Sequence, residues 1–487
     1  MQVIALSAIV VAPLVAAVTL VLLRRRARRY AMWIAGLAAL ISLASIFALL
    51  PTLQGGTAPA LQLPWIPAVG IGFRLRLDWL ALPFVVTEAG VTAVAVLYSW
   101  GYHHANARTP TYYALLMLFA AGMAGTTLAD DMFLFYIFWE LMLVASCILI
   151  ALWGEGEQRG AVALKYFLFT HFGSLMVLAA LVLLYSQAGS DSLSALRAGV
   201  SLAPAVANVV GVLTIVGFSV KMAVFPVHLW LPDAHTVAPM SVTIMLAAAM
   251  LSMGTYGILR FPFSALTGTQ IAPFGLPMMI AGLVSGIYGA LMSLAEQDVK
   301  RIIAYSSVSQ MGYVLFGLGT LTHEGVAGAT LHVIYHAIVK ALLFMCVGLV
   351  IRATGRRSIH ELGGLGRAMP LAAACTGVGA LAVAGTPPLA LFDSEWMIFA
   401  GGFQSEYLWL GVGMVLASLL TVAYALWFWG RVFFGVRFEA REPGAVSMFI
   451  VVPTVSLAFL ALIEGLFPAP LFDWAQHGLS LILGGAW

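Results

Sequence analysis

The sequence predicts an all-α integral membrane protein with about fourteen transmembrane helices, and three observations support this prediction. The chain of 487 residues is 62% apolar and only 9% charged, with a mean hydropathy of +1.01. Soluble globular domains do not have this composition. The apolar residues form stretches that are long enough to cross the hydrocarbon core of a bilayer. The basic residues gather at alternate ends of these stretches, as they do in multi-pass membrane proteins.

The expected spans are the apolar stretches of about 20 residues or more. They lie at roughly 2–23, 30–51, 78–100, 111–129, 132–153, 161–186, 203–229, 240–261, 273–295, 302–319, 325–352, 369–401, 408–435 and 447–467. The first stretch leads into a run of arginines and not into a small-residue cleavage site, so we interpret it as a span and not as a signal peptide. The loop at 52–77 is rich in Gly, Pro and Leu, and we expect a short hairpin there on the outer face.

The distribution of basic residues predicts the orientation. With the amino terminus outside, the inner loops hold 16 of the 23 Lys and Arg residues and the outer loops hold four, which is the positive-inside pattern. The other three, Lys165, Lys221 and Lys340, lie inside spans, whereas every arginine lies near a loop. A buried lysine can lose its proton and an arginine cannot. The pattern therefore favours a proton relay in a bacterial or archaeal inner membrane.

Two of the spans are expected to be broken. In the seventh, Pro226 follows Lys221 and removes a backbone donor. His228 lies seven residues after Lys221 and so near the same helical face, and we expect residues 230–235 to mark a membrane interface. The twelfth stretch is too long for one straight span and contains the Gly-Thr-Pro-Pro sequence 385–388. A break at membrane depth is tolerated only where it faces protein or lines a wet cavity.

Titratable residues recur inside the other spans. Glu140 lies in the fifth, and Glu395 follows the second break. His332, His336 and Lys340 are spaced at i, i+4 and i+8 in the eleventh, which predicts one stripe about 12 Å long on one helical face. Charged groups in lipid are expensive and mark functional sites by default. A series of Glu, Lys and His can pass protons through intervening water, and a Glu–Lys pair can act as its switch.

Other titratable residues in the spans can be explained by structural roles. We interpret Glu88 and Glu464 as paired structural charges, and His171 as a donor to a backbone carbonyl. Asp393 is either a helix cap at the break or part of the relay. Lys165 is either a fixed partner for an acid or part of the relay.

The cysteines exclude several classes of site. Cys147, Cys346 and Cys375 lie far apart in apolar stretches, without metal, disulfide or redox spacing. We therefore expect no cofactor, no metal and no catalytic residue in this chain, and no nucleic-acid partner.

Five motifs carry a resemblance to a known family. They are F-W-E-L-M at 138–142, K-M-A-V-F-P-V-H-L-W-L-P-D-A-H at 221–235, D-V-K-R-I-I-A-Y-S-S-V-S-Q-M-G at 298–312, H-A-I-V-K-A-L-L-F at 336–344 and G-T-P-P-L-A-L-F-D-S-E-W at 385–396. Over about residues 78–440 the chain resembles the antiporter-like subunits of respiratory complex I, the Mrp-type sodium/proton antiporters and the related membrane-bound hydrogenases. The resemblance implies fourteen helices with two inverted five-helix repeats, and with helices 7 and 12 broken.

The implied division of the chain has four parts. Residues 1–110 hold helices 1–3, residues 111–262 the first repeat with helices 4–8, and residues 263–435 the second repeat with helices 9–13. Residues 436–487 hold helix 14 and a tail.

The resemblance also implies roles for single residues. Glu140 in helix 5 and Lys221 in helix 7 match a gating ion pair. Glu395 in helix 12 favours the M-type (chain 4) subunit over the L type. The M type has a relay lysine in helix 8 where this chain has Ser252, whereas Lys340 in helix 11 is similar to L-type and antiporter relatives. The predicted proton-translocation residues are Glu140, Lys221, His228, Ser252, His332, His336, Lys340 and Glu395.

These implications predict a proton-translocating membrane subunit of a complex I-like, redox-driven pump. It would be part of an NADH:quinone oxidoreductase-type translocase, without a redox centre of its own, assembled with further antiporter-like and small membrane subunits. Two alternatives stay open. One is an antiporter-like subunit of an Mrp-type cation/proton antiporter or of a membrane-bound hydrogenase, with Na+ as a second ion. The other is a non-conducting structural subunit. If the relay conducts, we expect a hydrated cavity that joins Lys221, Ser252 and Lys340.

Overall fold

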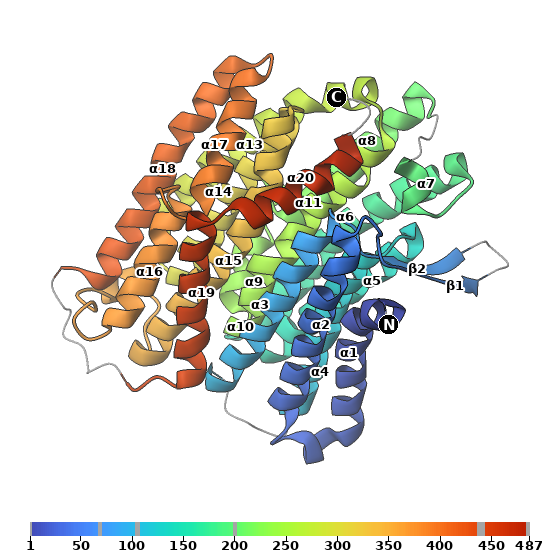
Figure 1. Ribbon diagram of the computed structural model, residues 1–487. Helices are drawn as coiled ribbons and strands as arrows, with labels where there is room; N and C mark the ends of the chain where they lie inside the picture. Colours follow the sequence, from blue (N-terminus) through green and yellow to red (C-terminus); the bar gives the residue numbers. More distant parts are fainter. Residues whose placement is uncertain (1, 67–70, 103–107, 198–201, 436–443, 484–487) are drawn as a thin grey trace.

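The computed structural model describes residues 2–66, 71–102, 108–197, 202–435 and 444–483. Long helices form a bundle from which one β-hairpin projects (Figure 1). Among the described residues, 13 helices are long and apolar enough to cross a membrane. The predicted all-helical membrane fold is therefore confirmed.

Most of the spans are single, uninterrupted helices. They are α1 (Gln2–Leu23), α2 (Ala31–Gln54), α3 (Ala81–Tyr102), α4 (Thr109–Leu128), α5 (Met132–Trp153), α6 (Arg159–Ala188), α13 (Gly268–Ala295), α14 (Val299–Gly319), α15 (His323–Thr354), α18 (Leu408–Phe433) and α19 (Met448–Leu466). Short helices α7 (Leu193–Arg197) and α12 (Pro262–Ala265) lie in the connections.

The predicted hairpin in the loop at 52–77 is confirmed. Strand β1 (Ala60–Ile66) pairs antiparallel with β2 (Ile71–Arg76). Arg74 of β2 forms ion pairs with Asp131, at the start of α5, and with Asp191. These contacts fasten the hairpin to the bundle.

The first break separates α8 (Pro204–Met222) from α9 (Leu231–Val237). The last residues of the predicted seventh span therefore belong to the break, at 223–230. Trp230 satisfies a carbonyl near the end of α8, because its Nε1 donates to the oxygen of Val220 at 2.9 Å. Trp230 and His235 are both fully buried and contact protein, whereas Asp233 between them is partly exposed, so the position of 230–235 at a membrane interface stays a prediction. Trp230 stabilises the break.

The second break separates α16 (Pro370–Val383) from α17 (Leu391–Gln404). Gly385 has a φ of +61° in this segment, a conformation that glycine adopts without strain. The Glu395 carboxylate packs so closely against Gly385 that a Cβ there would collide with it. The backbone conformation therefore favours glycine at 385, and a side chain there would displace the Glu395 carboxylate.

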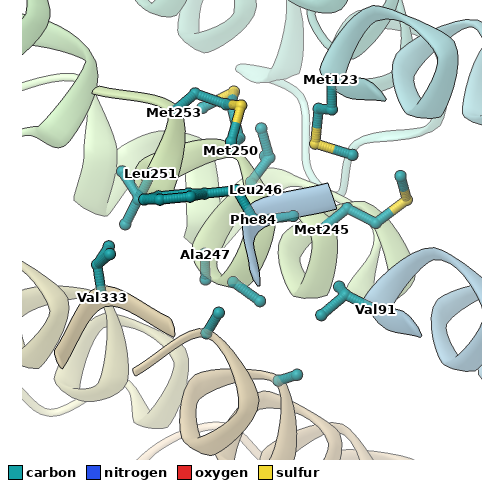
Figure 2. Close-up of a cluster of buried hydrophobic side chains, with 14 of the residues drawn as sticks. Phe84, Val91, Met123, Met245, Leu246, Ala247, Met250, Leu251, Met253 and Val333 are labelled. Atoms are coloured by element: carbon teal, nitrogen blue, oxygen red, sulfur yellow. The ribbon is translucent and has the colours of Figure 1, made fainter. Parts of the chain in front are cut away.

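The centre of the bundle is formed by helices that are buried on all sides. These are α14, α15 and the helix made of α10 (Met240–Met245), a π-helical turn (Leu246–Met250) and α11 (Leu251–Arg260). Figure 2 shows Phe84 of α3, Met123 of α4 and Val333 of α15 converging on residues 245–253 of the π-containing helix. Side chains at this centre meet protein and not lipid.

Helix α20 (Ala469–Leu483) was missed by the sequence analysis, which placed only a tail after the last span. It runs obliquely across the bundle (Figure 1, red). Its His477 ring lies 5.0 Å from the ring of Trp79, just before α3. It is too short to span a membrane at 1.5 Å per residue, which is why a search for long apolar stretches passes over it.

One end of the bundle is held by a charged network. Arg357 binds Glu155 and Asp298, both at 2.9 Å. Lys300, in the first turn of α14, is fully buried and donates to the oxygen of Ala238 at 2.8 Å.

Candidate functional site

The predicted gate acid, Glu140, lies on α5 and faces α6. Its Oε2 lies 3.1 Å from Nδ1 of His171. The interpretation of His171 as a donor to a backbone carbonyl is therefore wrong, because this ring contacts the gate acid. The other oxygen, Oε1, is buried and has no hydrogen-bond partner among the described residues. Glu140 thus keeps one site open for a proton, a water molecule or a cation.

Lys221 lies in the last turn of α8, directly before the first break, and is 2% exposed. Its Nζ has no hydrogen-bond partner in the described part of the chain and lies 5.2 Å from the ring centroid of Trp139, a cation–π contact. Glu140 acts on Lys221 electrostatically, but the two form no direct ion pair within the described ranges. The structure shows the two residues separated, and each has a polar atom without a hydrogen-bond partner among the described residues.

The stripe on α15 faces the interior as predicted, because His332, His336 and Lys340 are all fully buried. His332 is held by two contacts, Nδ1 to Ser394 Oγ at 3.1 Å and Nε2 to Gln310 Oε1 at 2.9 Å. Lys340 donates from Nζ to Ser306. Both nitrogens of His336 lack a partner among the described residues.

Two further histidines lie between the first break and this stripe. His235 of α9 stacks on Phe344 of α15 at 5.4 Å, and interacts electrostatically with His336. His228, in the first break, is 1% exposed and packs on Tyr288 at 4.9 Å. The ring nitrogens of His228 and His235 have no hydrogen-bond partners in the part of the chain that is described. His228 was a predicted site residue, whereas His235 was missed.

Glu395 lies at the far end of the stripe, beside the second break, and is 4% exposed. The carboxylate lies near Gln310, whose Oε1 contacts His332, but Gln310 Nε2 has no hydrogen-bond partner in the described part of the chain. Ser306 and Gln310 of α14 thus each contact one residue of the stripe, Lys340 and His332, and neither was predicted as a site residue. The available signal was the group of polar residues at 306–310 inside an otherwise apolar span.

The remaining candidates have more restricted surroundings. Lys165 is partly exposed and bonds Asp233 at 2.7 Å, and Asp233 also binds Arg301 at 2.8 Å. This supports the interpretation of Lys165 as a fixed partner. Asp393 lies in the first turn of α17, where no side-chain cap is formed, and it lines a groove of about 500 Å³ together with Tyr335.

Ser252 is buried in α11, just after the π-helical turn. Its Oγ donates to the oxygen of Ala249 at 2.5 Å, inside the π-helical turn, and the residue is 3% exposed. Its neighbours along the chain, Leu251 and Met253, belong to the apolar cluster of Figure 2. Helix α11 packs between α8, with Lys221, and α15, with Lys340. This packing does not support the predicted hydrated cavity at Ser252.

The two acids interpreted as paired structural charges have no ion pairs within the described ranges. Glu88 accepts a hydrogen bond from Thr127, and Glu464 has an oxygen without a partner. The interpretation as charge pairs is therefore wrong for both residues.

Two broken helices with buried lysines, histidines and acids between them define an antiporter-like membrane subunit. Residues 129–421 match the family described as NADH:quinone oxidoreductase/Mrp antiporter, TM. The chain is 33% identical over 447 residues to NAD(P)H-quinone oxidoreductase chain 4 2 of Microcystis aeruginosa, with 88% of this chain and 79% of that protein covered. It is 32% identical over 445 residues to F(420)H(2) dehydrogenase subunit M of Methanosarcina mazei, with 86% of each covered. The chain therefore belongs to the NADH:quinone oxidoreductase/Mrp antiporter family.

Solved structures of relatives have the same fold. A chain of the Mrp complex from Dietzia sp. superimposes with a TM-score of 0.86 at 29% identity, covering 99% of this chain and 52% of that one. A chain of respiratory complex I from Thermus thermophilus gives a TM-score of 0.85 at 25% identity, covering 99% and 100%. The relatives named chain 4 and subunit M confirm the resemblance to M-type (chain 4) subunits that the motifs predicted.

Proposed function

We propose that this chain is a proton-translocating membrane subunit of a complex I-like, redox-driven pump. The observation that carries the proposal is a series of titratable side chains near the two breaks, several of which have polar atoms without hydrogen-bond partners among the described residues. It starts at Glu140 and Lys221 and ends at Glu395. Buried polar atoms without partners are expensive, and groups that take up and give away protons need such open positions.

The proposed relay has two described segments. His332 contacts Gln310 Oε1 at 2.9 Å, and Gln310 lies near Glu395, although the Gln310 amide nitrogen has no hydrogen-bond partner among the described residues. His235 and His336 lie between the first break and Lys340, without hydrogen-bond partners among the described residues. Water must connect the segments, and the histidine nitrogens without partners are where such water would bind.

The names of the relatives support a subunit of a redox-driven membrane complex, but they do not agree on a single electron donor. One relative is an NAD(P)H-quinone oxidoreductase subunit and another is an F(420)H(2) dehydrogenase subunit. We infer that the chain assembles with other membrane subunits and with a redox arm that holds the cofactors. We also infer that α8 with α9 and α16 with α17 are the seventh and twelfth of fourteen spans, within two inverted repeats. The amino terminus would lie outside.

Replacement of Glu395 tests the proposed function. The assembled complex is reconstituted in vesicles, and proton and Na+ movements are measured against electron transfer. Glu395→Gln is expected to slow proton transport about tenfold, or 1.4 kcal/mol in the barrier, because the amide keeps the packing against Gly385 but cannot ionise. Glu464→Gln is the matched control and should transport normally. Normal transport by Glu395→Gln would place the exit elsewhere, and transport that needs Na+ but not electron transfer would favour the antiporter alternative.

The stripe on α15 gives a graded prediction. Lys340→Ala should reduce transport at least about tenfold, and His332→Ala by less. Both side chains are fully buried, but the ammonium carries a positive charge that also sets the field at its neighbours. Initial proton-transport rates in vesicles check the order, with Lys165→Ala as the control. Equal effects of the two replacements would show that the lysine charge has no special role.

The apolar packing at Ser252 favours one alternative, a non-conducting structural subunit. If the relay conducts, Ser252→Ala should lower transport by no more than about fivefold, since it removes one neutral hydrogen bond worth about 1 kcal/mol. In a non-conducting subunit, neither Ser252→Ala nor Lys340→Ala would change transport by the whole complex. The comparison of both variants with the wild-type complex therefore separates the two functions.

A further inference from the structure

A second acid lies close to the centre of the bundle, outside the series described above. Glu88 of α3 is 2% exposed. Its Oε1 accepts a hydrogen bond from Thr127 Oγ1 at 2.6 Å, whereas Oε2 is buried and has no partner among the described residues. The carboxyl therefore has one fixed oxygen and one open oxygen.

The carboxyl lines a small cavity between α1, α2, α3 and α4. About 20 Å³ in this cavity is available to the centre of a water molecule, which is enough to hold a water molecule. Two hydroxyl residues, Ser42 and Thr92, line the same cavity. Ser42 donates its own proton to the oxygen of Ile9 at 2.9 Å, so its lone pairs stay available to accept from a water molecule. The rest of the lining is apolar, so the Glu88 carboxyl and these two hydroxyl residues are the polar groups that a water molecule there could bind.

A chain of hydrogen bonds fixes the position of Glu88. The backbone carbonyl oxygen of Thr127 accepts a hydrogen bond from Tyr256 Oη at 2.5 Å, and Tyr256 Oη accepts one from Arg260 Nε at 2.8 Å. Arg260 in turn forms a bidentate ion pair with Asp78, from Nη1 to Oδ2 at 2.7 Å and from Nη2 to Oδ1 at 2.9 Å. This chain ties α3 to α4 and α11 and leaves the Glu88 carboxyl little freedom to turn away.

Glu88 also lies close to the middle of the π-containing helix. Thr127 Oγ1, which donates to Glu88, is 3.5 Å from the sulfur of Met253. Met253 directly follows Ser252. The acid is therefore one side chain away from α11, whose Leu251 and Met253 belong to the apolar cluster of Figure 2.

We propose that Glu88 is a further proton-carrying group of this subunit, which exchanges its proton with one water molecule bound in the cavity between α1, α2, α3 and α4. This inference rests on the proposed proton transport. The proton is held at Oε2, because Oε1 accepts from Thr127. It passes along the hydrogen bond from Oε2 to the water oxygen, which leaves Glu88 as a carboxylate, and the water gives one of its own protons to solvent water that enters the cavity. Thr127, Tyr256 and Arg260 are positioning residues.

The test uses the assembled complex in vesicles and has two readouts. The first is the infrared C=O band of a protonated carboxyl and its shift on exchange from H2O to D2O. Glu88→Gln should remove one exchanging band, and Glu464→Gln should leave that band in place. The second is the rate of proton transport, which Glu88→Gln should lower about tenfold. Ser42→Val fills the cavity and leaves the carboxyl intact, so it should slow both exchange and transport even if Glu88→Gln fails to assemble.

The outcomes separate this inference from the proposed function. If Glu88→Gln and Ser42→Val both transport at the wild-type rate while Glu395→Gln is slow, Glu88 is a structural hydrogen-bond acceptor and the inference is wrong. If Glu395→Gln also transports normally, the proposed relay is wrong. A Glu88 band that exchanges at the same rate in Ser42→Val as in the wild type would overturn the role of the bound water.

Discussion

Replacing Glu140 with glutamine is expected to lower proton transport about 100-fold without loss of the assembled complex. A positioned acid or base contributes roughly 100- to 10,000-fold to a proton transfer, and we take the lower end for a relay step. Glutamine keeps the size of the side chain and its contact with His171. It cannot carry a negative charge, so Lys221 loses the acid that acts on it. Since Lys221 Nζ has no hydrogen-bond partner in the described part of the chain, no other group compensates.

The same experiment has a matched pair of lysine variants. Lys221→Met should reduce transport as strongly as Glu140→Gln, because it removes the other half of the gate. Lys165→Met is the control, since this lysine is partly exposed and is bound to Asp233 at 2.7 Å. Transport is measured as the initial rate of pH change in vesicles, divided by the rate of electron transfer. Coupled transport at the wild-type level in Glu140→Gln would contradict the gate.

Hydropathy predicted most of the fold because lipid imposes a simple rule on each span. A stretch that crosses the bilayer must be long and apolar, and its backbone must be satisfied internally. Proline at 226 and at 387–388 located both breaks for the same reason, since it removes backbone donors. Helix α20 escaped this rule because it is too short to span. The burial of Trp230 and His235 could not be predicted either, because the sequence around a Trp that faces protein looks the same as the sequence around one at a membrane interface.

The site was predicted as a set of residue types and not as a set of contacts. Charged residues in spans are rare enough that Glu140, Lys221, Lys340 and Glu395 could be selected from the sequence. Their partners could not, because Ser306, Gln310 and Ser394 are ordinary polar residues whose importance comes from their neighbours in space. His171 was misassigned for the same reason, since its contact with Glu140 depends on how α5 and α6 face each other.

The pair formed by Arg260 and Asp78 is the clearest case of a contact that only the structure shows. The two residues are 182 positions apart in sequence. Both are 3% exposed, and the guanidinium binds both carboxylate oxygens. The pair also supports Tyr256, which donates to the oxygen of Thr127 next to Glu88.

Replacing Arg260 with methionine is expected to destabilise the protein by about 3–5 kcal/mol, because it leaves the buried charge of Asp78 without its partner. The measurement is the loss of folded protein on heating in detergent, compared with the wild type. The double variant Asp78→Leu/Arg260→Met should recover most of that loss, since no uncompensated charge stays buried and apolar side chains of similar size can pack in its place. Arg431→Met, at the last turn of α18, is the matched control and should change stability by less than about 0.5 kcal/mol. If the single and double variants lose the same stability, the pair contributes through packing and not through its charges. Recovery of stability without recovery of transport would show that the Arg260–Tyr256–Thr127 contacts are needed to place Glu88.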